Sequence, residues 1–273
     1  MSSQPDFYFP LPPLNFWQGL RYCHDPRLVW YHTRQVVRAE NLVMGLTGAP
    51  RETVREAMYE VWRDEAFLRD FLGRHRQLTK REPRGTDFMF LSLTGGSPYF
   101  HPVMLYTLVR VMKPAVVVET GGTPGNSSAF ILRALDRNQY GELHTVDLPP
   151  TGTLGEYDGD GIWIHAGLPE GQGSGWAVPE WLRGRHHQHL GDAKILLPGV
   201  LEQVGQVDIF IHDSDHSYEH MAWEFAAAWP AVVAGGSLLS DDIRANTAFD
   251  EFVSQHQLTP LRAGGFGAVR KPG

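Results

Sequence analysis

The sequence contains little cysteine and no long hydrophobic run. Its 273 residues include one cysteine, Cys23, so no intrachain disulfide forms, and packing is the expected role of the thiol. No stretch approaches the ~18 apolar residues of a transmembrane helix. The first residues also lack the basic flank and apolar core of a secretory signal. We therefore expect a cytoplasmic protein with no membrane partner.

An excess of basic charge is also absent. The chain has 24 Lys and Arg against 31 Asp and Glu, which gives a formal net charge of -7. Because phosphate binding requires a basic surface, we expect no nucleic-acid partner. Hydrophobic residues, by contrast, make up 42% of the chain and charged residues 20%. This composition is typical of a folded globular protein with a sizeable core.

We predict that residues 1–98 form an N-terminal extension. Its first twenty residues are rich in aromatic side chains and contain prolines that prevent a helix. This arm is expected to pack on its own domain or on a second subunit, which would make the protein a homo-oligomer. Apolar residues at helical spacing predict one helix over 27–46 and another over 51–78.

Residues 99–273 alternate between apolar strand patterns and helix patterns. The expected strands cover 115–118, 142–146, 187–190, 207–212 and 236–240, followed by a hairpin of 258–262 and 266–270. The intervening helices are expected at 104–112, 127–135, 178–185, 193–204, 218–233 and 246–256. This alternation predicts an α/β fold with a mostly parallel sheet and helices on both faces.

A long glycine-rich segment, residues 151–176, interrupts this pattern. Loops of this length inside a compact domain are usually lids, binding loops or disordered segments. Both interpretations, a substrate-facing lid and plain disorder, remain open from the sequence.

The first chemical motif is VVVETGGTPGNSS over residues 116–128. A strand ends at Glu119 and a helix follows. Between them Gly121, Gly122 and Gly125 let the backbone approach a ligand closely. The spacing is not that of a dinucleotide loop, and a carboxylate suits an ammonium group better than a pyrophosphate. The cofactor-binding residues predicted here are Glu119, Thr120, Gly121, Gly122, Gly125, Ser127 and Ser128.

Two further acidic residues follow predicted strands. Asp147, with Leu148 after it, stands about twenty positions beyond the glycine loop, where an acidic residue commonly binds a ribose hydroxyl pair. Asp192, with Ala193 after it, is a candidate partner for an adenine amino group. Asp192 also precedes an apolar run, so a helix N-cap explains it equally well.

Three carboxylates follow the next two strands. Asp213 comes after 207–212, and Asp241 and Asp242 come after 236–240. If these strands are neighbours, the three side chains lie at one edge of the sheet. Hard oxygen ligands of this kind suit Mg²⁺, Mn²⁺ or Ca²⁺. The alternative is that one aspartate caps a helix and another is solvated.

His216 is the candidate catalytic residue. It lies three positions past Asp213, and imidazole titrates near neutral pH, so it suits a general base. His212, inside the strand end, is expected to be structural, whereas Asp215 either orients His216 or acts as a ligand.

Together these residues resemble the class I S-adenosylmethionine-dependent methyltransferases over roughly residues 104–271. Glu119, Gly121 and Gly125 match that family's first motif, Asp147 its ribose-binding acid and Asp192 its adenine-side acid. The DSDHSYE segment is similar to macrocin-type and mycinose-type sugar O-methyltransferases. Asp213, Asp241 and Asp242 look like the metal triad of catechol-type O-methyltransferases. Asp242 departs from the usual Asn of that triad, and His216 stands where those enzymes carry a lysine base.

The resemblance implies a seven-stranded methyltransferase sheet and methyl transfer from S-adenosylmethionine to a hydroxyl of a small molecule, natural product or sugar-bearing. Mg²⁺ is the expected metal. Three alternatives remain: a metal-independent methyltransferase that uses His216 alone, a nicotinamide-dependent oxidoreductase, and a cofactor-binding scaffold without turnover.

Overall fold

The computed structural model describes residues 26–75, 100–148, 156–157, 163–164, 168 and 171–273. The predictions for the arm over residues 1–20, for Cys23 and for most of the 151–176 segment lie outside these ranges. Within them, no helix is long and apolar enough to cross a membrane.

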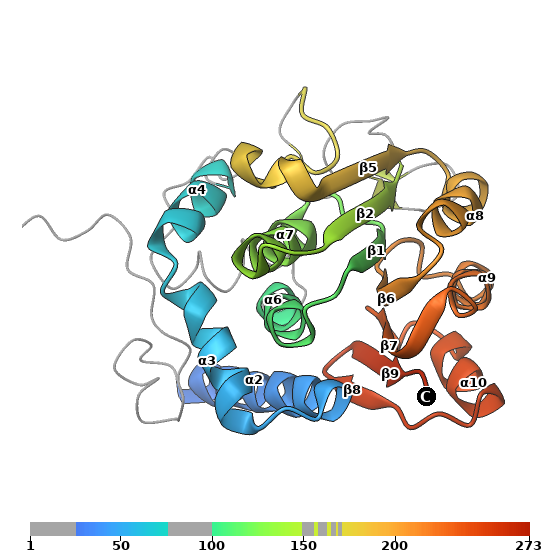
Figure 1. Cartoon of the computed structure of the whole chain (residues 1–273), viewed down its shortest axis with the longest axis horizontal. Helices are drawn as coiled ribbons and strands as arrows, with labels where there is room; N and C mark the ends of the chain where they lie inside the picture. Colours follow the sequence, from blue (N-terminus) through green and yellow to red (C-terminus); the bar gives the residue numbers. More distant parts are fainter. Residues whose placement is uncertain (1–25, 76–99, 149–155, 158–162, 165–167, 169–170) are drawn as a thin grey trace, which may run out of the picture.

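A seven-stranded sheet forms the centre of the fold (Figure 1). Its spatial order is β5-β2-β1-β6-β7-β9-β8, with parallel pairing from β5 to β7 and antiparallel pairing at β9 and β8. The strands are β1 (Val116–Thr120), β2 (Glu142–Asp147), β5 (His186–Leu190), β6 (Val207–His212), β7 (Val232–Ser240), β8 (Leu261–Ala263) and β9 (Phe266–Arg270). Strand order reverses between β1 and β6. In open α/β sheets the ligand crevice lies at the carboxyl ends beside such a reversal.

Helices cover both faces of the sheet (Figure 1). One face carries α6 (Phe100–Met112), α7 (Asn126–Asn138) and the short 3₁₀ helix η2 (Glu180–Arg185). The other carries α8 (Ala193–Val204), α9 (Tyr218–Ala228) and α10 (Ala248–Gln255). The predicted fold class, a Rossmann-like methyltransferase sheet with a C-terminal antiparallel hairpin, is confirmed. A separate small hairpin pairs β3 (Glu156–Tyr157) with β4 (Trp163–Ile164).

The described part of the N-terminal extension shares the hydrophobic core of the sheet. It consists of α2 (Pro26–Thr47), α3 (Arg51–Trp62) and α4 (Glu65–His75). Phe67 and Phe71 of α4 both meet Phe130 of α7 edge-on, at ring-centroid distances of 5.0 and 5.2 Å. The helices of the extension thus help bury one face of the sheet.

The prediction of a single helix over 51–78 is wrong, because the helix is interrupted at Arg63 and Asp64. The Asp64 Oδ1 atom accepts a hydrogen bond from the Phe67 N–H (3.3 Å) and so starts α4. The same carboxylate binds Arg133 and Arg137 of α7. Apolar spacing continues through the break, so periodicity alone did not reveal it.

Two other predicted helices differ from those observed. The helix expected over 218–233 ends at Ala228, because Val232 already pairs with Val207 as part of β7. The helix expected over 178–185 is the 3₁₀ helix η2.

Candidate active site

The predicted site residues gather at the carboxyl edge of the sheet. Gly121, Asp213 and Asp241 each follow a strand directly, and each N–H donates to a carbonyl at the end of the neighbouring strand at 2.9 Å. These hydrogen bonds hold the three residues side by side across β1, β6 and β7. β6 and β7 are neighbours in the sheet, so the condition under which Asp213 and Asp241 share one edge is met.

The loop after β1 requires glycine at two positions. Gly121 has φ +68°, and a Cβ there would lie 2.0 Å from the carbonyl oxygen of Asp213. Gly125 has φ +105° and precedes α7, and a Cβ there would lie 2.9 Å from the Cα of Gly175. Because both close contacts involve backbone atoms, no side chain fits at either position without displacing the neighbouring backbone. The loops at this carboxyl edge of the sheet are called the rim below.

Glu119 is buried beneath this loop with one carboxylate oxygen unpaired. Its Oε2 atom accepts a hydrogen bond from the Ser128 hydroxyl (2.5 Å), whereas Oε1 has no hydrogen-bond partner among the described residues. Burial raises the pKa of Glu119 to about 7, although hydrogen bonds from Ser127 and Ser128 oppose the shift. A buried carboxylate that lacks a cationic partner fits the ammonium group of a bound amino-acid moiety.

Asp147 ends β2 at the same edge. Its Oδ2 atom accepts hydrogen bonds from the hydroxyls of Thr123 and Ser174, and burial raises its pKa. Neither hydroxyl was among the residues predicted from the sequence. Ser174 lies near the end of the glycine-rich segment, so this hydrogen bond ties that end of the segment to the rim. Leu148 is 51% exposed beside it.

Asp192 caps the N-terminus of α8. This was one of the two roles that the sequence allowed, the other being contact with an adenine amino group. Its Oδ1 atom accepts a hydrogen bond from the Lys194 N–H at 2.8 Å, and Ala193 is buried behind it. A role at the adenine amino group stays a prediction.

His216 lies between two of the predicted carboxylates. Its Nε2 atom is 3.8 Å from Asp213 Oδ1, and its Nδ1 atom is 3.9 Å from Asp242 Oδ2. The imidazole is 28% exposed, and Asp242 is 64% exposed. Burial and the neighbouring His212 lower the pKa of His216. The ring is therefore neutral at pH 7.

The three predicted metal ligands share the rim without forming a compact group. Within the described ranges, the ligand atoms that all lie within 4.8 Å of one another belong to Glu142, His144 and His187, not to these aspartates. Asp241 Oδ1 instead lies 3.3 Å from the Nδ1 atom of His101, at the start of α6. Burial and the nearby carboxylates, Asp241 first, raise the pKa of Asp213. The metal site stays a prediction.

Glu224 of α9 organises the loop that carries His216, and sequence reasoning missed it. It accepts hydrogen bonds from His212 Nδ1 (2.6 Å), Ser214 Oγ (2.8 Å) and His220 Nε2 (2.8 Å), and also from the Thr120 hydroxyl. Burial alone would raise its pKa, but the bonds to His212 and His220 lower the pKa of Glu224 to about 2. The only sequence signal was a glutamate among apolar helical neighbours. His212 is fully buried at the end of β6, as expected.

The strand order and the terminal antiparallel hairpin define a class I methyltransferase sheet. Residues 118–243, a little under half of the chain, match the family described as "Methyltransferase domain". This segment is therefore similar to methyltransferase domains, and the sheet around it has the strand order of the class I methyltransferase fold. The match does not support the nicotinamide-dependent alternative.

Several solved structures are similar to the chain at low identity. CalS11, a calicheamicin methyltransferase, is 16% identical and has a TM-score of 0.49, with 74% of this chain and 91% of that chain covered. An O-methyltransferase from Bacillus cereus is 17% identical with a TM-score of 0.45, at coverages of 76% and 91%. TomG from Streptomyces achromogenes is 16% identical with a TM-score of 0.46, at coverages of 77% and 91%. A search of curated proteins found no match.

Proposed function

We propose that the protein transfers the methyl group of S-adenosylmethionine to a hydroxyl oxygen of a small molecule, with His216 as the general base. The observation that carries this proposal is the position of the imidazole. It lies at the carboxyl edge of a methyltransferase sheet, between Asp213 and Asp242 and beside the loop that covers Glu119.

The residues around the loop suit the parts of this cofactor. The unpaired Oε1 atom of Glu119 would bind the ammonium group, and Asp147 would bind the ribose hydroxyls in place of Thr123 and Ser174. Gly121 brings the backbone close to the ligand. When bound, S-adenosylmethionine supplies an electrophilic methyl carbon on its sulfonium.

His216 would take the proton from the acceptor hydroxyl. Because its pKa is lowered by burial and by His212, the neutral ring offers a lone pair at pH 7. Asp242 would then stabilise the imidazolium through its negative charge. The rest of the rate enhancement would come from holding the acceptor oxygen in line with the methyl carbon.

Assistance by Mg²⁺ is a second form of the same proposal. Asp213, Asp241 and Asp242 offer the oxygen ligands that this ion prefers, but His216 lies between two of them and His101 faces the third. This arrangement favours the metal-independent form, in which His216 acts alone. Turnover that survives dialysis against a chelator would support that form, and loss of turnover restored by Mg²⁺ would support the other.

The test is transfer of a tritiated methyl group from S-adenosylmethionine to a panel of phenolic and sugar hydroxyl acceptors. We expect His216→Ala to lower kcat by about 10²–10⁴-fold while the Kd for S-adenosylmethionine stays within about threefold, less than 1 kcal/mol. Free imidazole should restore part of the rate. His256→Ala, at the exposed residue that follows α10, is the matched control and should keep full activity. The proposal fails if His216→Ala turns over as fast as the wild type.

A further inference from the structure

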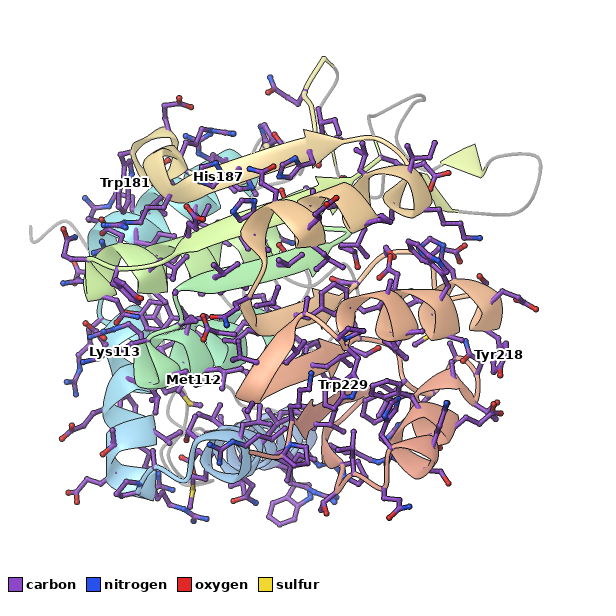
Figure 2. The ribbon with its side chains drawn as sticks, turned by 45° about the vertical axis from the view of Figure 1, so that its right-hand side comes forward. Met112, Lys113, Trp181, His187, Tyr218 and Trp229 are labelled. Atoms are coloured by element: carbon purple, nitrogen blue, oxygen red, sulfur yellow. The ribbon has the colours of Figure 1, made fainter. Side chains whose placement is uncertain are left out.

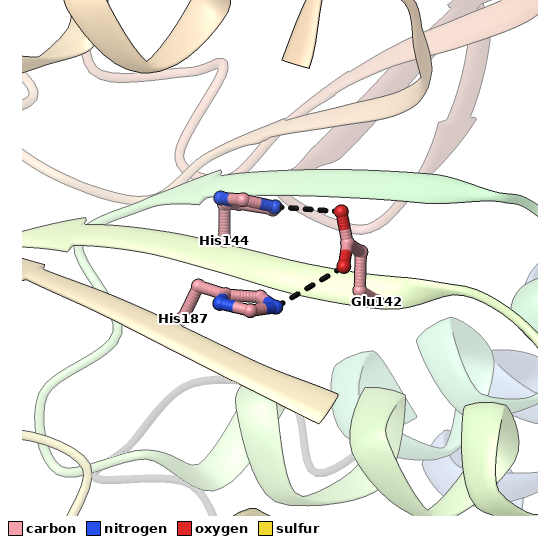
Figure 3. Close-up of side chains that lie close together, drawn as sticks. All are labelled: Glu142, His144 and His187. Carbon is pink, nitrogen blue, oxygen red and sulfur yellow. Dashed lines mark hydrogen bonds and ion pairs between the residues drawn. The ribbon is translucent and has the colours of Figure 1, made fainter. Parts of the chain in front are cut away.

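Three side chains with metal-ligating atoms meet on the strand pair β2 and β5, away from the active site. Glu142 and His144 come from the first half of β2, and His187 comes from the edge strand β5 (Figure 3). One ligand atom from each lies within 4.8 Å of the others. Neither the proposed methyl transfer nor the sequence motifs use these residues.

The two imidazoles direct the same ring atom at one carboxylate. His144 Nε2 lies 3.1 Å from Glu142 Oε1, and His187 Nε2 lies 3.1 Å from Glu142 Oε2. The histidines are register partners across the parallel strands, and their rings stack with centroids 4.6 Å apart. The backbone pairing of the sheet therefore holds the three groups together.

A third histidine fixes the orientation of the buried ring. His144 is 3% exposed, and its Nδ1 atom lies 3.3 Å from the Nε2 atom of His189. Metal-bound histidines usually make such a bond through their other ring nitrogen. The side chains of His187 and Glu142 are 48% and 43% exposed, so an ion can reach the group from solvent.

We propose that Glu142, His144 and His187 bind a divalent transition metal, with Zn²⁺ as the ion. Two imidazole nitrogens and one carboxylate oxygen are a typical ligand set for Zn²⁺ and a poor one for Mg²⁺, which prefers oxygen alone. Water completes the coordination. With the metal on Nε2, His144 and His187 each carry their ring proton on Nδ1. His144 Nδ1–H then donates to the Nε2 atom of His189, whose own ring proton shifts from Nε2 to Nδ1, so that no net proton is lost.

The bound metal links the edge strand β5 to β2, because its ligands come from both strands. Glu142 begins β2 and Asp147 ends it, so the site and the cofactor rim lie toward opposite ends of the strand. Figure 2 likewise shows His187 far from Tyr218, which begins α9 just after the His216 loop. Occupancy should therefore raise thermal stability and leave methyl transfer unchanged.

The experiment titrates metal-free full-length protein with ZnCl₂ and, for its visible spectrum, with CoCl₂. We expect one Zn²⁺ per chain and d–d bands of low-coordinate Co²⁺. His187→Ala and Glu142→Gln should each weaken Zn²⁺ binding by at least about tenfold, and His189→Ala by about tenfold as an outer partner. His256→Ala removes a histidine elsewhere and should leave binding unchanged. A large excess of Mg²⁺ should not displace Zn²⁺.

His187 is half exposed, so its variant should fold, and circular dichroism checks this. The proposal is overturned if folded His187→Ala and Glu142→Gln bind Zn²⁺ as the wild type does. It is also overturned if Asp241→Asn, at the rim, abolishes binding while His187→Ala does not. A Zn²⁺-induced rise in Tm that persists in His187→Ala would contradict it as well.

Discussion

Two buried glutamates near the rim have pKa values that are shifted in opposite directions. Glu119 receives hydrogen bonds only from serine hydroxyls and has a pKa raised by burial to about 7. Glu224 is equally buried, but bonds to His212 and His220 lower its pKa to about 2. The partners of each carboxylate decide the difference, because Glu224 accepts hydrogen bonds from two histidines inside the chain, whereas Glu119 has a serine hydroxyl as its partner.

Replacing Glu119 with glutamine should stabilise the cofactor-free protein at high pH. Because the folded pKa of Glu119 is raised from 4.5 to about 7, its contribution to stability is present below pH 4.5 and is lost as the pH rises toward 7. Above pH 7, Glu119→Gln should gain up to about 3 kcal/mol over the wild type. Urea unfolding at pH 5, 6, 7 and 8 measures this difference. A gap that stays constant with pH would contradict the raised pKa.

Glu224→Gln should have the opposite effect. The carboxylate of Glu224 accepts four side-chain hydrogen bonds, and an amide cannot replace them all. We expect a loss of about 3 kcal/mol at pH 7. Because the folded pKa lies at about 2, the wild type should lose this advantage as the pH falls from about 4.5 toward 2. Glu202→Gln, exposed on α8, is a control that should change little, and equal stability of the wild type and Glu224→Gln at pH 7 would refute the assignment.

Among the elements, the turn between β1 and α7 has the tightest backbone contact at the rim. Gly121→Ala places a methyl group 2.0 Å from the Asp213 carbonyl at a positive φ. We expect a loss of at least about 2 kcal/mol in stability and a loss of cofactor binding. Gly173→Ala is the matched control, because a Cβ there meets nothing within 4 Å. Thermal unfolding followed by titration with S-adenosylmethionine checks both variants, and a stable Gly121→Ala that still binds would count against this account of the loop.

At the same scale, the sequence predicted the strands better than the helix ends. Buried parallel strands appear as short apolar runs, and all seven strands of the main sheet were anticipated. The break between α3 and α4 was missed because Asp64 acts through Phe67, Arg133 and Arg137, which are set by tertiary packing. The end of α9 was overextended because pairing of Val232 with Val207 overrides the helical pattern.

The residues of the candidate site likewise fall into a group that the sequence predicts and a group that it does not. Acidic residues that follow strands, such as Asp147 and Asp213, are readable from sequence because parallel strands end at one edge. Ser174, His101 and Glu224 were not predicted, because their roles depend on where distant segments fold back. The sequence also could not predict how close the carboxylates of Asp213, Asp241 and Asp242 lie to one another. Their separation depends on the directions of the side chains rather than on strand register.

For the whole molecule, the described helices of the N-terminal extension and the sheet form one structure. α2, α3 and α4 contribute to the same hydrophobic core as α6 and α7, so removal of residues 1–98 should expose an apolar face. The rim and the histidine group on β2 and β5 lie toward opposite ends of the sheet. One is proposed to bind a cofactor and the other a metal, and each can be tested independently.

The central claim is that this rim binds S-adenosylmethionine, and isothermal titration calorimetry tests it most directly. The wild type should bind S-adenosylmethionine and give no heat with NADH. Asp147→Ala, which removes the carboxylate at the end of β2, should weaken binding by at least about tenfold, which is 1.4 kcal/mol. A folded wild-type protein that binds NADH instead, or an Asp147→Ala variant that binds S-adenosylmethionine as tightly as the wild type, would contradict it.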